Sequence, residues 1–325
     1  MGTGHVRRLA SVAVFAILVA LPMASPALAT VPGKNGLIVF RADVGSGYQI
    51  YTMRSNGRDV RQITHVDGDA LQPHWSPDAR RIAFEFDHPD GSVFCSVDVM
   101  NADGSDIVDL TTSANPVGWN GCEGAPSFSP DGSRIFFERY DAANDDDAIW
   151  SMNVAGGDRH RVTAGGGTDP EVSPDGTMLS YIGFGNADFQ QALVVSRIDG
   201  SNPVQLMPFS ADIAIKQDWA PDGQHLTFTD NADVPASANV ATIRPDGTDL
   251  RYLTHYTGGQ LRAYVGSYSP DGRWIVFRLE DHGRYALVEI RPDGSQMKTI
   301  MPLSDFRPRG MAWGTRVETD DTGGE

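Results

Sequence analysis

Short stretches of alternating apolar and polar residues recur along the chain, and each follows a turn rich in serine, proline and aspartate. After Ser129-Pro130-Asp131, for example, Ile135 and Phe137 stand two positions apart. Residues two apart share one face of a strand, so this alternation is typical of a half-buried β-strand. The pattern predicts an all-β protein made of many short antiparallel strands.

The turn and its strand form part of a unit that repeats along the chain. Five copies of an aromatic or valine followed by Ser-Pro-Asp or Ala-Pro-Asp begin at Trp75, Phe128, Val172, Trp219 and Tyr268. A variant at residues 32–36 precedes the apolar run 37–40 and supplies a sixth copy. A repeat of this kind is identified before single strands are assigned, because it determines the whole fold.

The second half of the unit is an apolar strand, a tight turn and a strand that closes on Thr or Met. The turn glycines are Gly57, Gly104, Gly156, Gly200, Gly247 and Gly294. Glycine adopts the positive φ of a tight hairpin at little cost, so we interpret these Asp-Gly pairs as turns and not as ligands. Five intervals cover 237 residues, about 47 each, which is close to the length of a four-stranded propeller blade.

Ser-Pro-Asp-Gly before an apolar-aromatic strand, followed by an Asp-Gly hairpin that ends in Leu-Thr, resembles the WD40-like repeats of the TolB family over residues 32–316. The resemblance implies a six-bladed β-propeller with four-stranded antiparallel blades. We expect the TolB N-terminal α/β domain to be missing, because a mature start near Thr30 leaves no room for it. Similar repeats also occur in the non-catalytic propellers of serine peptidases and in some lyases, so the resemblance implies a fold and not a single function.

The first copy of the unit lacks its own inner strand. Residues 311–315 stand where another Trp-Ser-Pro would fall, so we expect them to pair beside residues 37–40 and close the ring, which removes exposed sheet edges. The Ser-Pro-Asp and Asp-Gly turns must then share one face, called here the short-turn face. The longer connections share the other, called the loop-rich face, and we expect it to bind ligands because loops on a rigid scaffold carry function.

The N-terminus has the pattern of a secretory signal peptide. Arg7 and Arg8 precede the apolar run 9–21, and Ala27-Leu28-Ala29 offers the small residues of a cleavage site. A membrane anchor is the alternative, but it needs about 20 apolar residues and this run ends at Pro22. The prediction is a signal peptide at 1–29, one propeller domain at 30–316 and a disordered acidic tail at 317–325. We therefore expect a secreted protein of the extracellular space, cell envelope or periplasm, with no membrane span after cleavage.

The net charge bears on the class of partner, and the two cysteines predict a covalent link in the fold. The formal net charge of −16 disfavours nucleic acid as a partner. In an exported protein, Cys95 and Cys122 favour a disulfide, with both sulfurs near the loop-rich face. We place Cys122 in the loop that leaves the second blade.

No cofactor is expected, although Ca²⁺ binding at the acidic run 141–147 stays open beside a plain solvated loop. A metal in the central channel is also unproven, because the residues just before the inner-strand aromatic are not uniformly metal ligands. They are His74, Ser127, Glu171, Asp218, Ser267 and Ala312.

Charged and aromatic residues where the loops approach the inner strands are candidates for ligand binding, and each is otherwise a solvated loop residue. They are His65, Asp69, His74, Glu123, Asp169, Lys216, Asp218, Arg262, Tyr264, Arg307 and Arg309. Together they predict an acidic side of the channel from blades 2 to 4 and a more basic side from blade 6 to the closure. Aromatic residues that either anchor a partner or pack between blades are Phe184, Phe189, Phe209 and Tyr256.

The sequence contains neither a Gly-x-Ser-x-Gly nucleophile motif nor a His-Glu-x-x-His zinc motif. We therefore favour a monomeric binding module or scaffold that recognises a protein or cell-envelope component through the loop-rich face. The alternative is an extracellular enzyme, such as a polysaccharide lyase or metal-assisted hydrolase, that uses the channel mouth. A deep funnel of convergent His, Arg and carboxylates would favour the enzyme, and a broad face with apolar anchors would favour the binding module.

Overall fold

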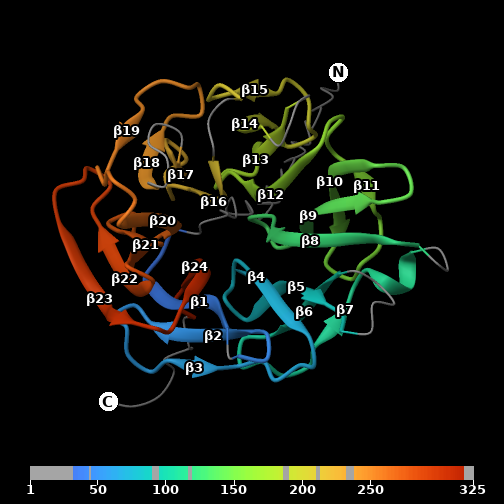
Figure 1. The fold of residues 1–325 in the computed structure, drawn as a ribbon. Coiled ribbons are helices and arrows are strands. Elements are labelled where there is room, and N and C mark those ends of the chain that lie inside the picture. The colour runs from blue at the N-terminus through green and yellow to red at the C-terminus, as the bar shows by residue number, and fades with distance from the viewer. Residues whose placement is uncertain are drawn as a thin grey trace, which may run out of the picture.

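A computed structural model describes residues 32–43, 45–89, 95–115, 119–185, 190–209, 213–231 and 238–317. These residues form six four-stranded antiparallel sheets arranged as blades around a central axis (Figure 1). The predicted six-bladed propeller is confirmed. The signal peptide predicted at 1–29 and nearly all of the tail predicted at 317–325 lie outside the described residues.

Each blade runs from an inner strand at the axis to an outer strand at the rim, which is two residues long in every blade but the sixth. The strands of a blade follow one another along the chain, except in blade 1, where the last strand of the chain is the inner one. Blade 1 contains β24 (Pro308–Thr315), β1 (Asn35–Asp43), β2 (Tyr48–Arg54) and β3 (Arg61–Gln62). Blade 2 contains β4 (Asp69–Trp75), β5 (Arg81–Asp87), β6 (Ser96–Asn101) and β7 (Val108–Asp109), followed by the 3-10 helix η1 (Thr112–Ala114). Blade 3 contains β8 (Gly121–Phe128), β9 (Arg134–Asp141), β10 (Asp146–Asn153) and β11 (His160–Arg161).

The other three blades follow the same order. Blade 4 contains β12 (Gly167–Val172), β13 (Met178–Phe184), β14 (Gln191–Arg197) and β15 (Val204–Gln205). Blade 5 contains β16 (Ile213–Trp219), β17 (Leu226–Asp230), β18 (Asn239–Ile243) and β19 (Arg251–Tyr252). Blade 6 contains β20 (Leu261–Tyr268), β21 (Ile275–Asp281), β22 (Arg284–Ile290) and β23 (Met297–Ser304).

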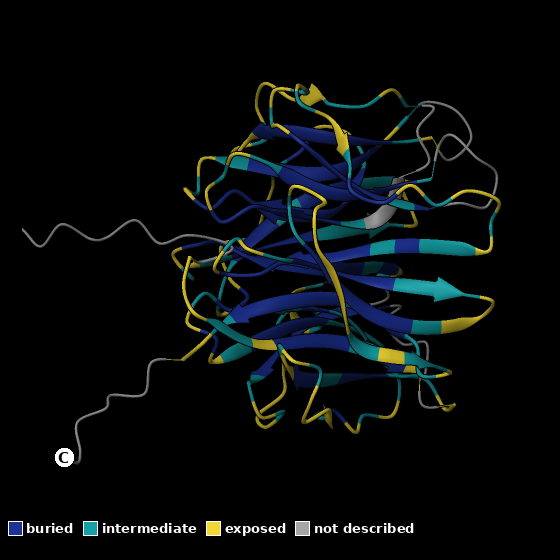
Figure 2. Ribbon diagram, turned by 90° about the vertical axis from the view of Figure 1, so that its left-hand side faces the viewer, coloured by how far each residue is buried: buried dark blue, intermediate teal, exposed yellow. Residues whose placement is uncertain are grey.

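The ring closes as predicted, by pairing the last strand with the first. In the antiparallel pair of β24 and β1, Trp313 lies opposite Ile38 and Ala312 lies opposite Val39. The apolar cores lie between neighbouring blades, where Val39 of blade 1 and Phe84 of blade 2 share one cluster. Figure 2 shows the strands buried along the interior of the ring and the exposed residues mostly at the turns. Each blade therefore depends on its neighbours for burial.

The Ser-Pro-Asp turn is stabilised by hydrogen bonds made by its own side chains. In blade 3, the Ser129 hydroxyl donates to Asp131 at 2.6 Å and accepts from the Arg134 amide at 2.9 Å. Gly132, with φ of 68°, supplies the left-handed residue that the turn needs. The motif is thus a local hairpin device, as the sequence indicates.

The closing threonine at the end of the outer strand also has a structural role. The Thr254 hydroxyl accepts from the buried Val240 amide at 2.9 Å, and Thr163 accepts from Ile149 at 3.0 Å in the same way. The rim strand is too short to satisfy this amide with a backbone carbonyl alone. The threonine therefore links the rim strand to the strand beside it.

The two cysteines form the predicted disulfide, with 4.6 Å between their Cα atoms. Cys95 directly precedes β6 of blade 2. Cys122 lies within β8, the inner strand of blade 3, and not in the connecting loop where the sequence analysis placed it. The loop prediction was wrong because β8 begins earlier than the repeat alone indicates. The bond consequently joins two neighbouring blades. Within the described residues, no helix has the length and apolar character needed to cross a membrane.

We predict that Thr254→Val lowers the free energy of unfolding by about 1–3 kcal/mol, because it leaves the buried Val240 amide without an acceptor. Thr248→Val makes the same chemical change in an exposed turn of the same blade and should stay within about 0.5 kcal/mol of the parent. Chemical denaturation of both variants measures the difference. Equal effects would show that the threonine does not serve this amide.

Candidate functional site

The inner strands share a bulge that turns side chains toward the axis. The register shifts three residues before the inner-strand aromatic or its equivalent, and five of the six residues at that position have positive φ. They are Gln72 (43°), Ala125 (47°), Asp169 (53°), Lys216 (122°) and Gly310 (58°). In blade 6 the shift falls between Val265 and Ser267. Positive φ is costly for residues other than glycine, and bulges re-aim side chains beside functional sites.

A cavity of about 280 Å³ opens where these bulges meet. Six of the eleven candidate ligand-binding residues line it, namely His74, Asp169, Lys216, Tyr264, Arg307 and Arg309. Since Arg307 directly precedes β24 in the connection from β23, the cavity belongs to the loop-rich side of the channel. Asp218 lines a second cavity of about 30 Å³ on the short-turn side. Six of the candidates therefore lie together at the channel mouth, and their role in binding stays a prediction.

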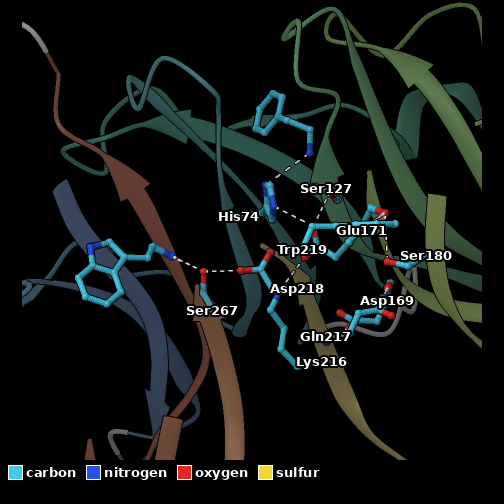
Figure 3. A network of polar contacts seen from close by, with 12 residues as sticks. His74, Ser127, Asp169, Glu171, Ser180, Lys216, Gln217, Asp218, Trp219 and Ser267 are labelled. Carbon is cyan, nitrogen blue, oxygen red and sulfur yellow. Dashed lines mark hydrogen bonds and ion pairs between the residues drawn. The ribbon is translucent and has the colours of Figure 1, made fainter. Parts of the chain in front are cut away.

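His74, Glu171 and Lys216 line both cavities and form the floor that separates them. Glu171 accepts from Lys216 Nζ at 2.6 Å and from the Ser127 hydroxyl at 2.9 Å, and its Oε2 lies 3.1 Å from His74 Nε2. Figure 3 shows these side chains converging on Glu171 from different blades. On the other side of Lys216, Asp218 accepts from the Ser267 hydroxyl at 2.8 Å.

The contacts continue around the axis and connect all the blades. The Trp313 amide of blade 1 donates to the Ser267 hydroxyl of blade 6 at 3.2 Å. The Thr315 hydroxyl of blade 1 donates to the Pro77 carbonyl of blade 2 at 3.3 Å. We call this set of contacts, from His74 through Glu171, Lys216, Asp218 and Ser267 to blade 1, the inner belt. It consists of buried and half-buried polar groups that are hydrogen-bonded to one another.

Charges within the inner belt alter one another's pKa. Burial alone would lower the pKa of Lys216, but Glu171, Asp169 and Asp218 together raise it. Burial opposes the charged form of Glu171, yet Lys216 and His74 hold its pKa below the usual value. Burial raises the pKa of Asp169 to about 6, and burial together with Glu171 raises that of Asp218 to about 6. Lys216 is the cation that allows three carboxylates to share this buried space.

The sequence analysis missed a second set of residues around the channel. The residue just after the aromatic of the second strand faces the bulge of the next blade: Glu85 accepts from the Ala125 amide at 3.1 Å, and Thr229 accepts from the Val265 amide at 2.8 Å. The equivalent residues in the other blades are Arg41, Glu138, Ile182 and Arg278. Reading this repeat position across the blades would have found them.

This position carries the charge division that the sequence predicts. It is arginine in blades 1 and 6, where Arg41 and Arg278 line the cavity. It is glutamate in blades 2 and 3, where burial raises the pKa of Glu85 to about 7 and that of Glu138 to about 8. Glu85 and Glu138 are therefore partly protonated near neutral pH, whereas the arginines remain charged.

Four candidate residues lie away from the cavity. The fully buried Glu123 pairs with Arg139 and Arg159. Asp69 accepts from the Tyr48 amide at 2.7 Å, and the exposed His65 contacts Gln62. These contacts hold strands and loops together. The fourth, Arg262, has its guanidinium 3.8 Å from the Glu280 carboxylate.

The sequence also singled out four aromatic residues and the acidic run 141–147, and the structure places them in different environments. Tyr256 packs against the core between blades 5 and 6, so it is a packing residue, whereas Phe184 is 36% exposed. Phe209 is half-buried and Phe189 lies outside the described residues. In the acidic run, Asp141 accepts from the Ala143 amide at 3.0 Å and caps its own turn. Calcium binding at this run stays a prediction.

With the ring and the channel described, comparison with known proteins identifies the class. The family model for the TolB beta propeller domain matches residues 89–317, and the chain belongs to this family. An uncharacterized protein of Agrobacterium fabrum is 28% identical over 241 residues, which cover 70% of this chain and 74% of that protein. A TolB homolog of Chlorobium chlorochromatii is 26% identical over 148 residues, 45% of this chain and 30% of that protein.

A solved structure agrees with the family assignment at the level of the fold. The crystal structure of TolB from Acinetobacter baumannii has a TM-score of 0.69 at 20% identity, and the match covers 88% of this chain and 68% of that one. At this identity the likeness shows the propeller fold alone. The residues of the channel therefore have to be interpreted from their own chemistry.

We predict that Lys216→Met lowers the free energy of unfolding by about 3–5 kcal/mol, because it leaves Glu171, Asp169 and Asp218 buried without their cation. The loss should be greatest above about pH 6, since protonation of the carboxylates at lower pH relieves it. Denaturation at pH 5 and pH 8 measures both effects. Lys34→Met, which removes an exposed lysine, is the matched control and should have little effect at either pH.

Glu138 should make stability depend on pH. Its pKa in the folded protein is about 8, above its ordinary value, so the folded state holds a proton that the unfolded chain releases. The contribution is complete below about pH 4.5 and is lost as the pH rises through 8. We predict that Glu138→Gln flattens the fall in melting temperature between pH 5 and pH 8, while the exposed Asp67→Asn leaves it unchanged. A parallel fall in Glu138→Gln and the parent would contradict the assignment.

Proposed function

We propose that this protein is an exported binding module or scaffold that recognises a protein or cell-envelope component through the loop-rich face of the propeller. The observation that carries the proposal is the charged cavity at the channel mouth, which the closing strand and the bulged inner strands hold in place. Secretion is supported by the predicted signal peptide and by the disulfide, because disulfides persist in oxidising compartments. The family also includes proteins of the Tol-Pal system, of which one is a short match to this chain.

An extracellular enzyme is the second candidate function, because His, Arg and carboxylate groups converge at the channel mouth. His74 is poorly placed to act as a base there. Its Nδ1 lies 3.4 Å from the Phe128 amide and its Nε2 lies 3.1 Å from Glu171, so both ring nitrogens are engaged within the protein. A general base needs a nitrogen that is free to reach substrate. This occupancy favours binding over catalysis.

Capture from envelope and secreted extracts tests the proposal, followed by direct binding of the purified captured component. We expect the double reversal Arg307→Glu and Arg309→Glu to reduce binding at least tenfold, because both residues line the cavity. Arg54→Glu and Arg58→Glu make the same charge change on the short-turn face and should leave binding intact. The opposite pattern, with loss only on the short-turn face, would refute the proposed surface.

A further inference from the structure

The charges that line the channel mouth do not balance. Five basic residues and two acidic residues line the cavity, in a protein whose formal net charge is −16. Both acidic residues, Asp169 and Glu171, are neighbours of Lys216 in the inner belt. The remaining basic residues are Arg41, Arg278, Arg307 and Arg309. The excess charge of the cavity is thus positive and lies on the side of blades 6 and 1.

These four arginines are placed against one another. In the antiparallel pair of β1 and β24, Arg41 lies directly opposite Arg309, an arrangement of like charges that destabilises a sheet. Burial, together with the neighbouring Arg309 and Arg307, lowers the pKa of Arg278 to about 10. Burial also lowers the pKa of Arg41, and Arg309 adds to that effect while Glu85 opposes it. The site thus costs stability as it stands.

The guanidinium groups also have unused donors. The Nε atoms of Arg41, Arg278, Arg307 and Arg309 are buried and make no hydrogen bond to any part of the chain that the structure describes. The nearest carboxylate to Arg278 is Glu280, at 3.8 Å. Aromatic rings lie against three of the groups: Arg278 is 4.3 Å from the ring centre of Tyr264. Arg307 is 5.0 Å from the ring centre of Tyr285, and Arg41 is 5.3 Å from that of Tyr48. Arginines held on ring faces present their planar donors in a fixed direction.

An anion bound in this cavity would reduce the repulsion between the arginines. It would also accept hydrogen bonds from their unpaired Nε donors. The planar fork of a guanidinium matches the two oxygens of a carboxylate. Tyr264, Val265 and Met311 line the same cavity and offer apolar surface to the rest of a ligand. The volume of about 280 Å³ is at the lower end of the range for small-molecule sites.

We propose that the channel mouth binds a small organic acid, with its carboxylate among Arg41, Arg278, Arg307 and Arg309 and its carbon skeleton against Tyr264 and Met311. The inference rests on the binding role proposed above and names the ligand chemistry of that site. An inorganic anion would use the arginines alone and leave the apolar wall unused. The proposal therefore requires preference for an organic acid over sulfate.

Isothermal titration calorimetry at low ionic strength tests the ligand class with D-glucuronate, citrate and succinate. D-glucose is the uncharged match for glucuronate, sulfate is the inorganic anion, and the peptide Glu-Glu-Glu stands for acidic side chains of a partner protein. We expect at least one of the three acids to bind, sulfate to bind at least tenfold more weakly than that acid, and glucose not to bind. The proposal is overturned if none of the acids binds, if sulfate binds as tightly as the best acid, or if only the peptide binds.

Variants separate a ligand site from a structural one. Arg309→Gln should weaken acid binding at least tenfold and raise the melting temperature of the unliganded protein, because it removes the repulsion with Arg41. Arg309→Lys should bind with intermediate affinity, since it keeps the charge and loses the planar fork. Arg54→Gln, an exposed arginine on the short-turn face, is the control and should change binding less than twofold. A lower melting temperature with unchanged binding in Arg309→Gln would assign this residue a structural role and overturn the proposal.

The two proposals can fail separately. Capture of a partner that depends on Arg307 and Arg309, without binding of any organic acid, would overturn the small-acid inference and leave the proposed function standing. Binding of an acid with no partner that depends on these arginines would support the inference and refute recognition of a macromolecule at this face.

Discussion

The pairing of β24 with β1 is the constraint on which the rest of the structure depends. Blade 1 takes its inner strand from the C-terminal end of the chain, so the ring is complete only when residues about 275 positions apart lie opposite each other in paired strands, as Ile38 and Trp313 do. The apolar cores lie between blades, and an open ring would expose the cores on both sides of the gap. Closure also brings Arg309 beside Arg41. The same strand pair therefore completes the fold and builds the basic wall of the channel.

Around the axis, buried charged groups are stabilised by partners from neighbouring blades and not by partners within the same blade. Lys216 of blade 5 donates to Glu171 of blade 4, and Asp218 of blade 5 accepts from the Ser267 hydroxyl of blade 6. Such a network specifies a particular arrangement of blades, because a displaced blade would leave buried charges unpaired. It also forms the floor of the cavity. The network thus holds the blades in place, and the arginine side, whose Nε donors are unpaired within the described chain, is the part that we propose for ligand binding.

Much of the site could be predicted because the repeat aligns equivalent residues. The places where the loops approach the inner strands located His74, Lys216 and Asp169 near the axis, and the charge division followed from comparing blades. Arg41 and Arg278 were missed because they belong to second strands, which the alternation alone assigns to sheet faces. Glu123 was placed at the mouth because its loop approaches an inner strand, but two arginines hold it in a fully buried ion pair. Ion-pair partners that are far apart in sequence produce no local sequence pattern from which the pair could be predicted.

The number of blades, the turn chemistry and the closing strand could all be predicted without a structure, because each rests on short-range rules: φ at glycine, the two-residue period of a strand and the recurrence of one unit. The tertiary structure decided which charges meet. The bulges at Asp169 and Lys216 arise where an inner strand pairs with its neighbour in the blade, and the opposition of Arg41 to Arg309 arises only when the ring is closed. The energy of a buried charge depends on every group within a few ångströms, and those groups come from different blades.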